Sequence, residues 1–132
     1  MAHNTHAFRK VAEKGGVALF YSHPSKSDHN KNPTEFISEI TQQLTNLHGK
    51  RWQWIIDAEG FDLKHALGIE PGMELSTLLT DKYGESLVEI KFINPTWHLR
   101  SLINLIWPFL TSGLKAKIQI LGDKAHSILE FI

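Results

Sequence analysis

The sequence of 132 residues contains no cysteine. Disulfide bonds, thiolate zinc sites, iron–sulfur ligation and a cysteine nucleophile are therefore excluded. The chain also has no excess of positive or negative charge, because 14 Lys and Arg balance 14 Asp and Glu. Proteins that bind nucleic acids through the phosphate backbone carry a strong excess of positive charge, so we expect no nucleic-acid partner.

Long apolar runs are missing as well. The most apolar stretch, residues 102–110, is interrupted by Asn104 and Pro108, whereas a membrane-spanning helix needs about 20 apolar residues. The N-terminus has no apolar run behind a basic start, so no secretory signal is predicted. We therefore expect a cytoplasmic protein that contacts membranes, if at all, at their periphery.

The remaining composition is that of a globular domain. Hydrophobic residues make up 42% of the chain and charged residues 21%, which are ordinary proportions for a folded protein. The length allows one domain with a buried core. Residues 1–14 are polar and mildly basic. We expect them to be a flexible N-terminal segment, followed by a single domain over 15–132.

Strand and helix patterns alternate from residue 17 onward. Apolar runs bounded by turn residues predict strands at 17–21, 52–57, 87–93 and 117–121. Apolar residues at helical spacing predict helices over 36–47, 73–83 and 97–110, and a last helix from Asp123. Thr96 is the predicted N-cap of the helix over 97–110. Residues 61–68 fit either a short helix or an irregular crossover. Such alternation is typical of an α/β fold, with a largely parallel sheet covered by helices.

No set of catalytic residues emerges. The turn after the first predicted strand, residues 22–27, lacks the glycines that let backbone amides approach a pyrophosphate. Asp57 ends a predicted strand, where open α/β sheets place ligand or catalytic groups; the competing interpretation is a turn-forming Asp before Gly60. The eight histidines include no helical metal-ligand pair. We expect a non-catalytic protein with no metal and no cofactor.

The stretch over 97–110 carries apolar residues on more than one side. The stripe expected to pack on a sheet consists of Leu99, Leu102, Ile103, Ile106 and Leu110. Further apolar bulk on other sides comes from Trp97, Leu105, Trp107 and Phe109. Pro108 should bend or end the helix near Asn104. Either this helix is sandwiched inside the core, or one side lines a cavity or contacts a membrane or a partner.

Several short blocks, in this order, resemble the CRAL-TRIO (Sec14-like) lipid-binding domain. They are Tyr83-Gly84-Glu85, residues 90–97 (Ile-Lys-Phe-Ile-Asn-Pro-Thr-Trp), residues 105–110 (Leu-Ile-Trp-Pro-Phe-Leu) and Lys117-Ile118. In that family a Tyr-Pro-Glu helix end precedes a strand, an Asn/His-Pro turn, a gate helix ending in Pro-Phe-Leu, and a Lys-Ile strand. The likeness covers roughly residues 15–125. It is greatest for the divergent branch of Rho GTPase-activating, BCH scaffold and ganglioside-induced differentiation-associated proteins.

The resemblance implies a single CRAL-TRIO-like domain, truncated relative to the full transfer proteins. Residues 97–110 would be the gate helix over an acyl-chain pocket, with ligand contacts from Trp97, Leu99, Leu102, Ile103, Ile106, Trp107, Phe109 and Leu110. Glu85 and Lys117 match positions that hold the headgroup in phosphoinositide carriers, although Ser86 and Leu114 replace the Arg and Thr of those carriers. Arg100 and Lys115 are further cations suited to an anionic headgroup.

Two functions remain open from the sequence. The first is non-catalytic binding of a hydrophobic or lipid ligand, which includes phospholipid or phosphoinositide binding or transfer, with peripheral membrane contact. The second is a protein-interaction (scaffold) module of the divergent CRAL-TRIO/BCH type, in which Trp97, Trp107 or Phe109 contacts a protein partner or a second copy. An enzyme that uses Asp57 and His65 is the third interpretation.

Overall fold

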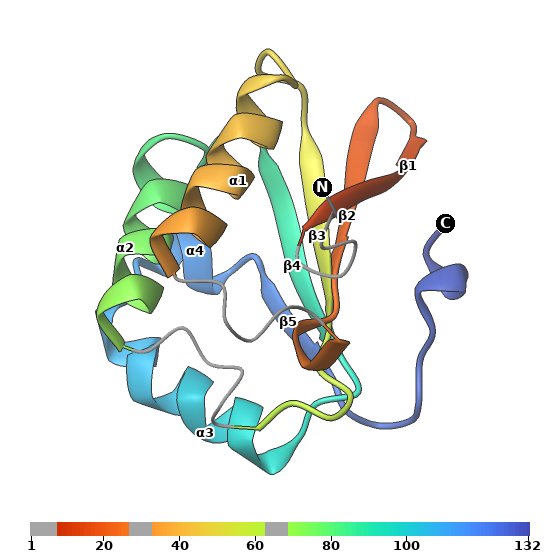
Figure 1. Cartoon of the computed structure of the whole chain (residues 1–132), viewed down its shortest axis with the longest axis vertical. Helices are drawn as coiled ribbons and strands as arrows, with labels where there is room; N and C mark the ends of the chain where they lie inside the picture. The colour runs from red at the N-terminus through yellow and green to blue at the C-terminus, as the bar shows by residue number, and fades with distance from the viewer. Residues whose placement is uncertain (1–7, 27–32, 63–68) are drawn as a thin grey trace.

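The computed structural model (Figure 1) describes residues 8–26, 33–62 and 69–132. Five strands form one sheet in the order β1-β2-β3-β4-β5. They are β1 (Arg9–Lys14), β2 (Val17–Ser22), β3 (Trp52–Asp57), β4 (Leu87–Ile93) and β5 (Ile118–Leu121). β1 is antiparallel to β2, and the other neighbours are parallel. The prediction of a single α/β domain with a largely parallel sheet is confirmed.

The helices of the described ranges cover one face of the sheet. They are α1 (Pro33–Thr45), α2 (Ile69–Asp81), α3 (Trp97–Ile106) and α4 (Ser112–Lys115). The described ranges also contain the short 3-10 turns η1 (Pro24–Lys26), η3 (Trp107–Phe109) and η4 (Ile128–Glu130). Because parallel strands are added in chain order, right-handed crossovers all pass over the same face. Figure 1 shows the helices on one side of the sheet and the C-terminal segment on the other.

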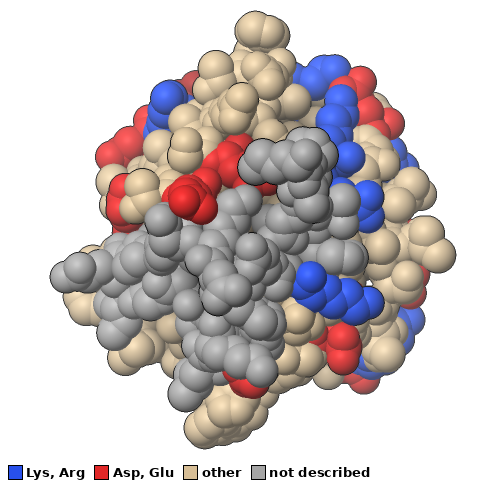
Figure 2. All heavy atoms as spheres, viewed as in Figure 1, with Lys and Arg blue, Asp and Glu red and all other residues tan. Residues whose placement is uncertain are grey.

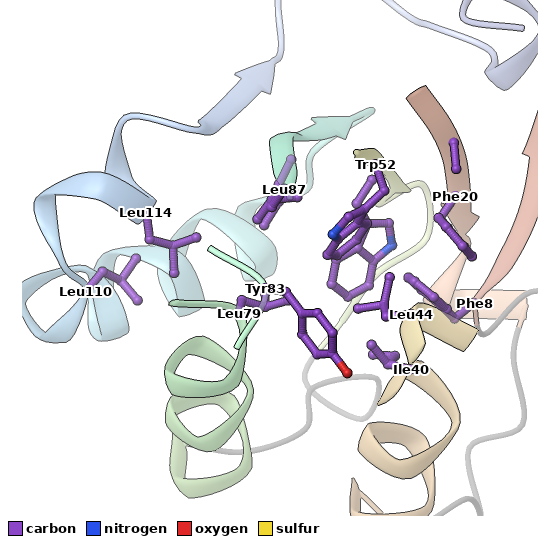
Figure 3. Packing of buried hydrophobic residues seen from close by; sticks show 13 residues of the cluster. Phe8, Phe20, Ile40, Leu44, Trp52, Leu79, Tyr83, Leu87, Leu110 and Leu114 are labelled. Atoms are coloured by element: carbon purple, nitrogen blue, oxygen red, sulfur yellow. The ribbon is translucent and has the colours of Figure 1, made fainter. Parts of the chain in front are cut away.

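The main core lies between the sheet and helices α1 and α2. The rings of Phe8 and Phe20 stack with centroids 4.5 Å apart, and the Phe8 ring contacts Trp54 edge to face at 5.1 Å. Figure 3 shows Ile40 and Leu44 of α1 directed at these rings. Aromatic pairs in such geometries contribute about 0.5–1.5 kcal/mol beyond their buried area. The core therefore includes Phe8, which precedes the first strand.

Residues 9–14 form β1, which corrects the expectation of a flexible segment over 1–14. Gly15 and Gly16 both have positive φ, 58° and 80°, and two such residues in succession make the tight turn of a β-hairpin. Across this turn Lys14 pairs with Val17. The Gly-Gly pair was the sequence signal for this hairpin. Because residues 1–14 are polar, they were predicted to be flexible instead. Residues 1–7 lie outside the described part of the chain.

The C-terminal segment (residues 122–132) is not the helix expected from Asp123. After β5 it makes only the short η4 turn. The Asn94 side chain accepts a hydrogen bond from the His126 backbone N–H at 2.8 Å and donates one to the His126 carbonyl at 2.8 Å. Because both backbone groups of His126 are bonded to a side chain, they are unavailable to a helical ladder. A tertiary contact has overridden the helical pattern.

This segment covers part of the second face of the sheet. Its side chains Ile128 and Phe131 pack against the cluster of Leu19, Tyr21, Ile55 and Ile93. Parallel sheets are usually covered on both faces, so these contacts shield an apolar area that would otherwise meet water.

The surface carries both signs of charge. On the face drawn in Figure 2, Lys and Arg lie near Asp and Glu around the periphery, as the zero net charge leads one to expect. Within the described ranges, no helix is long and apolar enough to cross a membrane.

Candidate functional site

Helix α3 begins at the turn where the chain leaves β4. The Thr96 hydroxyl accepts a hydrogen bond from the Leu99 N–H at 3.3 Å and donates one to the Phe61 carbonyl at 2.8 Å. Asn94, two residues earlier, has a φ of 53°, a left-handed conformation that Asn tolerates better than most residues. The predicted N-cap is confirmed, and it also ties α3 to the segment that follows β3.

Replacing Thr96 by Ala is expected to lower the free energy of unfolding by about 1–2 kcal/mol, because the N-cap bond and the bond to Phe61 are both lost. Urea unfolding followed by circular dichroism measures the change. Thr77→Ala, at an exposed position of α2, is the matched control and should stay within about 0.5 kcal/mol of the parent. Equal losses in the two variants would contradict the assigned role of Thr96.

The helix ends at Ile106, and residues 107–109 tighten into the η3 turn. Pro108 has no backbone N–H and cannot continue the α-helical ladder. The prediction that Pro108 ends the helix is confirmed, although the end comes two residues after Asn104. Thr111 then caps α4 by accepting a hydrogen bond from the Leu114 N–H at 3.2 Å.

The inner side of α3 belongs to the hydrophobic core. Leu99 and Ile103 are buried and pack with Ala58 and Phe61 from the segment that follows β3. Leu110, beyond the helix, is buried in the main core. In this conformation, three of the eight predicted ligand-contacting residues are therefore packed inside the protein.

The outer side of α3 and η3 is open to water. Trp97, Leu105 and Phe109 are 73%, 54% and 65% exposed, whereas Leu102, Ile106 and Trp107 are half-buried. These exposures rule out the interpretation of a helix sandwiched inside the core. Large apolar side chains exposed along one stretch of chain are typical of a contact with lipid or with another protein.

An open groove of about 100 Å³ lies beside Phe109. Its lining consists of Met73, Ser76, Thr77, Thr80 and Asp81 of α2 and, facing them, Phe109, Leu110 and Thr111. Pockets that enclose whole small-molecule ligands measure about 300–1,000 Å³. In this conformation the groove has room for a chain end or a side chain, and not for a whole phospholipid.

Two of the four predicted headgroup residues, Glu85 and Lys117, lie at the amino ends of strands. The Lys117 ammonium group donates a hydrogen bond to the Gly84 carbonyl, directly before Glu85 in the chain. Lys117 therefore holds the turn that leads into β4. Glu85 is exposed in that turn.

The other two headgroup candidates lie apart from each other. The Lys115 ammonium is 5.7 Å from the centroid of the Trp107 ring, at the end of the apolar stretch. Arg100 lies against Gly122, beyond the opposite end of β5, so close that a Cβ on that glycine would collide with the guanidinium. The structure therefore does not bring Arg100 together with Lys117.

Asp57 adopts the role of a turn-forming residue. Its Oδ1 accepts hydrogen bonds from the Glu59 N–H and from the Asn94 side-chain amide, both at 3.0 Å. Its Oδ2 is 3.6 Å from Nδ1 of His23. The geometry matches the turn-forming interpretation of Asp57. His65 and the other residues of 63–68 lie outside the described part of the chain, so the choice between a short helix and an irregular crossover over 61–68 stays open.

Tyr21 lies beside Asp57 and His23, and its hydroxyl is 3.0 Å from His23 Nδ1. Burial, followed by the negative charge of Asp57, raises the pKa of Tyr21 to about 12. The ionised tyrosine is thus disfavoured in the folded chain, whereas an unfolded chain ionises it near pH 10.

The stability of the protein is accordingly expected to fall as pH rises from about 10 to 12, because the unfolded state releases the Tyr21 proton first. The contribution of this group is about 1 kcal/mol per pH unit. Urea unfolding at pH 9 and pH 11 should show a smaller drop in Tyr21→Phe than in the parent. Identical drops in both proteins would contradict the assignment.

Asn94 and Phe61 both help to position α3, and neither role was predicted from the sequence. For Asn94 a signal existed, because Asn tolerates left-handed conformations and stands directly before Pro95. Phe61 gave no signal, since one apolar residue in a segment without periodicity does not indicate its partner.

A family model for the CRAL/TRIO domain matches residues 10–132, from β1 to the C-terminal segment. CRAL/TRIO domains in general bind lipids or other small hydrophobic ligands and are carriers rather than catalysts. The matched range includes α3 and its exposed side chains. The chain belongs to the CRAL/TRIO domain family.

Proposed function

We propose that the chain binds a phospholipid and that the outer side of α3 and η3 contacts the membrane that supplies it. The observation that carries the proposal is the exposure of Trp97, Leu105 and Phe109 on an element whose other side is buried. Burying a large apolar side chain gains about 1.5–3 kcal/mol. Tryptophan also favours the interface between membrane and water. We place this contact at the periphery of a cytoplasmic membrane surface.

Two groups of residues take part in succession under this proposal. Trp97, Phe109 and the half-buried Trp107 are accessible and meet the lipid first. Leu99 and Ile103 are packed on the segment after β3, so they reach an acyl chain only if α3 moves away from it. Such a movement also enlarges the space beside α2, which supports binding of a whole lipid.

For an anionic headgroup we propose Lys115 and Lys117. They lie near one another in the chain, before and at the start of β5, and Lys115 already contacts Trp107. A phosphate held there leaves the acyl chains directed along η3 and α3. A narrower version of this proposal is that the site selects phosphoinositides. In that version Glu85, in the turn that Lys117 contacts, also binds the headgroup.

Lipid uptake is measured directly by native mass spectrometry. Purified protein is incubated with phosphatidylcholine vesicles, separated from them and compared with protein that met no vesicles. The proposal predicts a saturable species heavier by one phospholipid, with the protein monomeric. Lys115→Gln with Lys117→Gln should lower uptake from phosphatidylinositol vesicles more than uptake from phosphatidylcholine vesicles. An unchanged mass after vesicle contact would contradict lipid binding.

The second candidate function is a protein-interaction module. It is favoured by the small volume of the groove beside Phe109, which suits a partner side chain. Exposed Trp residues are frequent centres of binding energy in protein interfaces. Self-association lost in Trp107→Ala, in a protein that takes up no lipid, would favour this function over the first.

A further inference from the structure

The two edges of the sheet differ in how well they are protected against pairing with another chain. β1 forms one edge and β5 the other. Four of the six residues of β1 are charged and exposed: Arg9, Lys10, Glu13 and Lys14. The pairing of β1 with β2 also shifts register between Lys10 and Ala12. Edge charges and bulges are features that prevent a strand from pairing with another chain, so the β1 edge is protected.

The β5 edge has neither of these features. Its sequence, Ile118-Gln119-Ile120-Leu121, contains no charged residue and no proline. Its pairing with β4 continues without a shift in register from Ile118 to Leu121. Gln119 is exposed, and the other three residues are half-buried. The length of four residues is a feature that still limits pairing at this edge, and it restricts a partner to a short strand.

The outer side of β5 is formed by the backbone groups of Ile118 and Ile120. Alternate residues of a parallel strand direct their N–H and C=O groups to opposite sides. The Lys117 carbonyl accepts the Ile90 N–H at 2.8 Å, so Lys117 and every second residue after it face β4. Ile118 and Ile120 therefore face outward. Among the described residues, no other strand pairs with this side of β5.

A second β5 strand that runs antiparallel to the first matches these outward groups. Ile118 of each copy then exchanges both backbone hydrogen bonds with Ile120 of the other copy, so every outward N–H and C=O is paired. The two-fold axis passes between the two Gln119 residues, whose amides each carry a donor and an acceptor. No like charges oppose one another within the strand pair. Because β5 is already ordered in each copy, it pairs without the loss of freedom that an extended peptide suffers.

We propose that two copies of the chain form a weak dimer through antiparallel pairing of their β5 strands. The five strands of each copy then join into one continuous sheet. Association ends at two copies, because the contact is two-fold symmetric and the remaining β1 edges are protected. Since only four residues of each copy pair, the interface is small, and we expect half-dimerisation on the order of 100 µM. At the few micromolar typical of native mass spectrometry the protein is therefore monomeric.

Sedimentation velocity of the lipid-free protein, from about 5 to 500 µM, tests the dimer. The sedimentation coefficient of the parent should rise toward that of a dimer. Gln119→Lys should remain monomeric, because it places two positive charges opposite each other at the axis. Gln42→Lys, at an exposed position of α1, and Phe109→Ala, on the outer side of η3, should dimerise like the parent. A parent that stays monomeric overturns the proposal and leaves the edge to a strand of another protein. Equal loss of the dimer in Gln119→Lys and Gln42→Lys also overturns it.

The register of the pairing is tested by a single engineered cysteine, because the chain has none of its own. Opposite residues of a non-hydrogen-bonded antiparallel pair have Cα atoms about 4.5 Å apart, a separation that a disulfide can bridge. Under mild oxidation Gln119→Cys should form a covalent dimer at least tenfold faster than Gln42→Cys, whose thiol is also exposed. Equal rates in the two variants overturn the β5 contact. Because no lipid is present, failure here is distinct from failure of lipid uptake.

Discussion

Replacing Phe8 by Ala is expected to lower the free energy of unfolding by about 3–5 kcal/mol, a large share of the 5–15 kcal/mol typical of a domain. Phe8 is 1% exposed. Its ring stacks on Phe20 and contacts Trp52 and Trp54 edge to face. Because strands β2 and β3 fix the surrounding rings, these rings cannot close the cavity that the substitution leaves. Urea unfolding followed by circular dichroism measures the loss.

The matched control for this substitution is Phe109→Ala. The Phe109 ring is exposed, so its removal should change the free energy of unfolding by no more than about 0.5 kcal/mol. A loss below about 1 kcal/mol in Phe8→Ala would mean that the chain before β1 is not part of the core. The flexible segment expected over 1–14 would then be the better description.

The double substitution Trp97→Ser and Phe109→Ser is expected to weaken binding to phosphatidylcholine vesicles by about 100-fold or more. Each aromatic side chain contributes at least about 1.5 kcal/mol when it leaves water, and 1.4 kcal/mol corresponds to a factor of ten. Both side chains are exposed in the free protein, so the fold should be unaffected. Vesicle flotation at a series of lipid concentrations gives the partition coefficient.

A second double variant, Leu129→Ser with Ile132→Ser, controls for the loss of exposed apolar surface as such. These residues are exposed on the C-terminal segment, on the face of the sheet opposite the helices (Figure 1). Partitioning close to that of the parent is expected. If both double variants bind vesicles like the parent, the outer side of α3 is not the membrane contact. Loss of self-association in the first variant alone would instead indicate a protein interface.

The parts of the fold that sequence patterns predicted are those that depend on local signals. Apolar runs located β2, β3, β4 and β5, and alternation with helices indicated a parallel sheet. Thr96 as N-cap and Pro108 as the end of α3 follow from the chemistry of one residue each, a hydroxyl acceptor and a missing N–H. These features do not depend on what packs against them.

The parts that could not be predicted depend on contacts between distant residues. The apolar pattern of Ile128 and Phe131 fits a helix, but the bond between Asn94 and the His126 backbone prevents one. The apolar stripe of α3 indicated its inner side correctly for Leu99 and Ile103, but it gave no indication that Phe61 packs there, because Phe61 lies in a segment without periodicity. Arg100 and Lys117 looked alike as cations, and only the fold places them at opposite ends of β5.

Quenching by brominated acyl chains tests most directly whether the outer side of α3 enters lipid. In a Trp107→Phe variant, Trp97 is the exposed indole, since Trp52 and Trp54 are buried in the core. We predict that phosphatidylcholine vesicles shift its emission to shorter wavelength and that brominated chains quench it. Emission at the same wavelength and intensity with and without brominated vesicles would contradict the membrane contact.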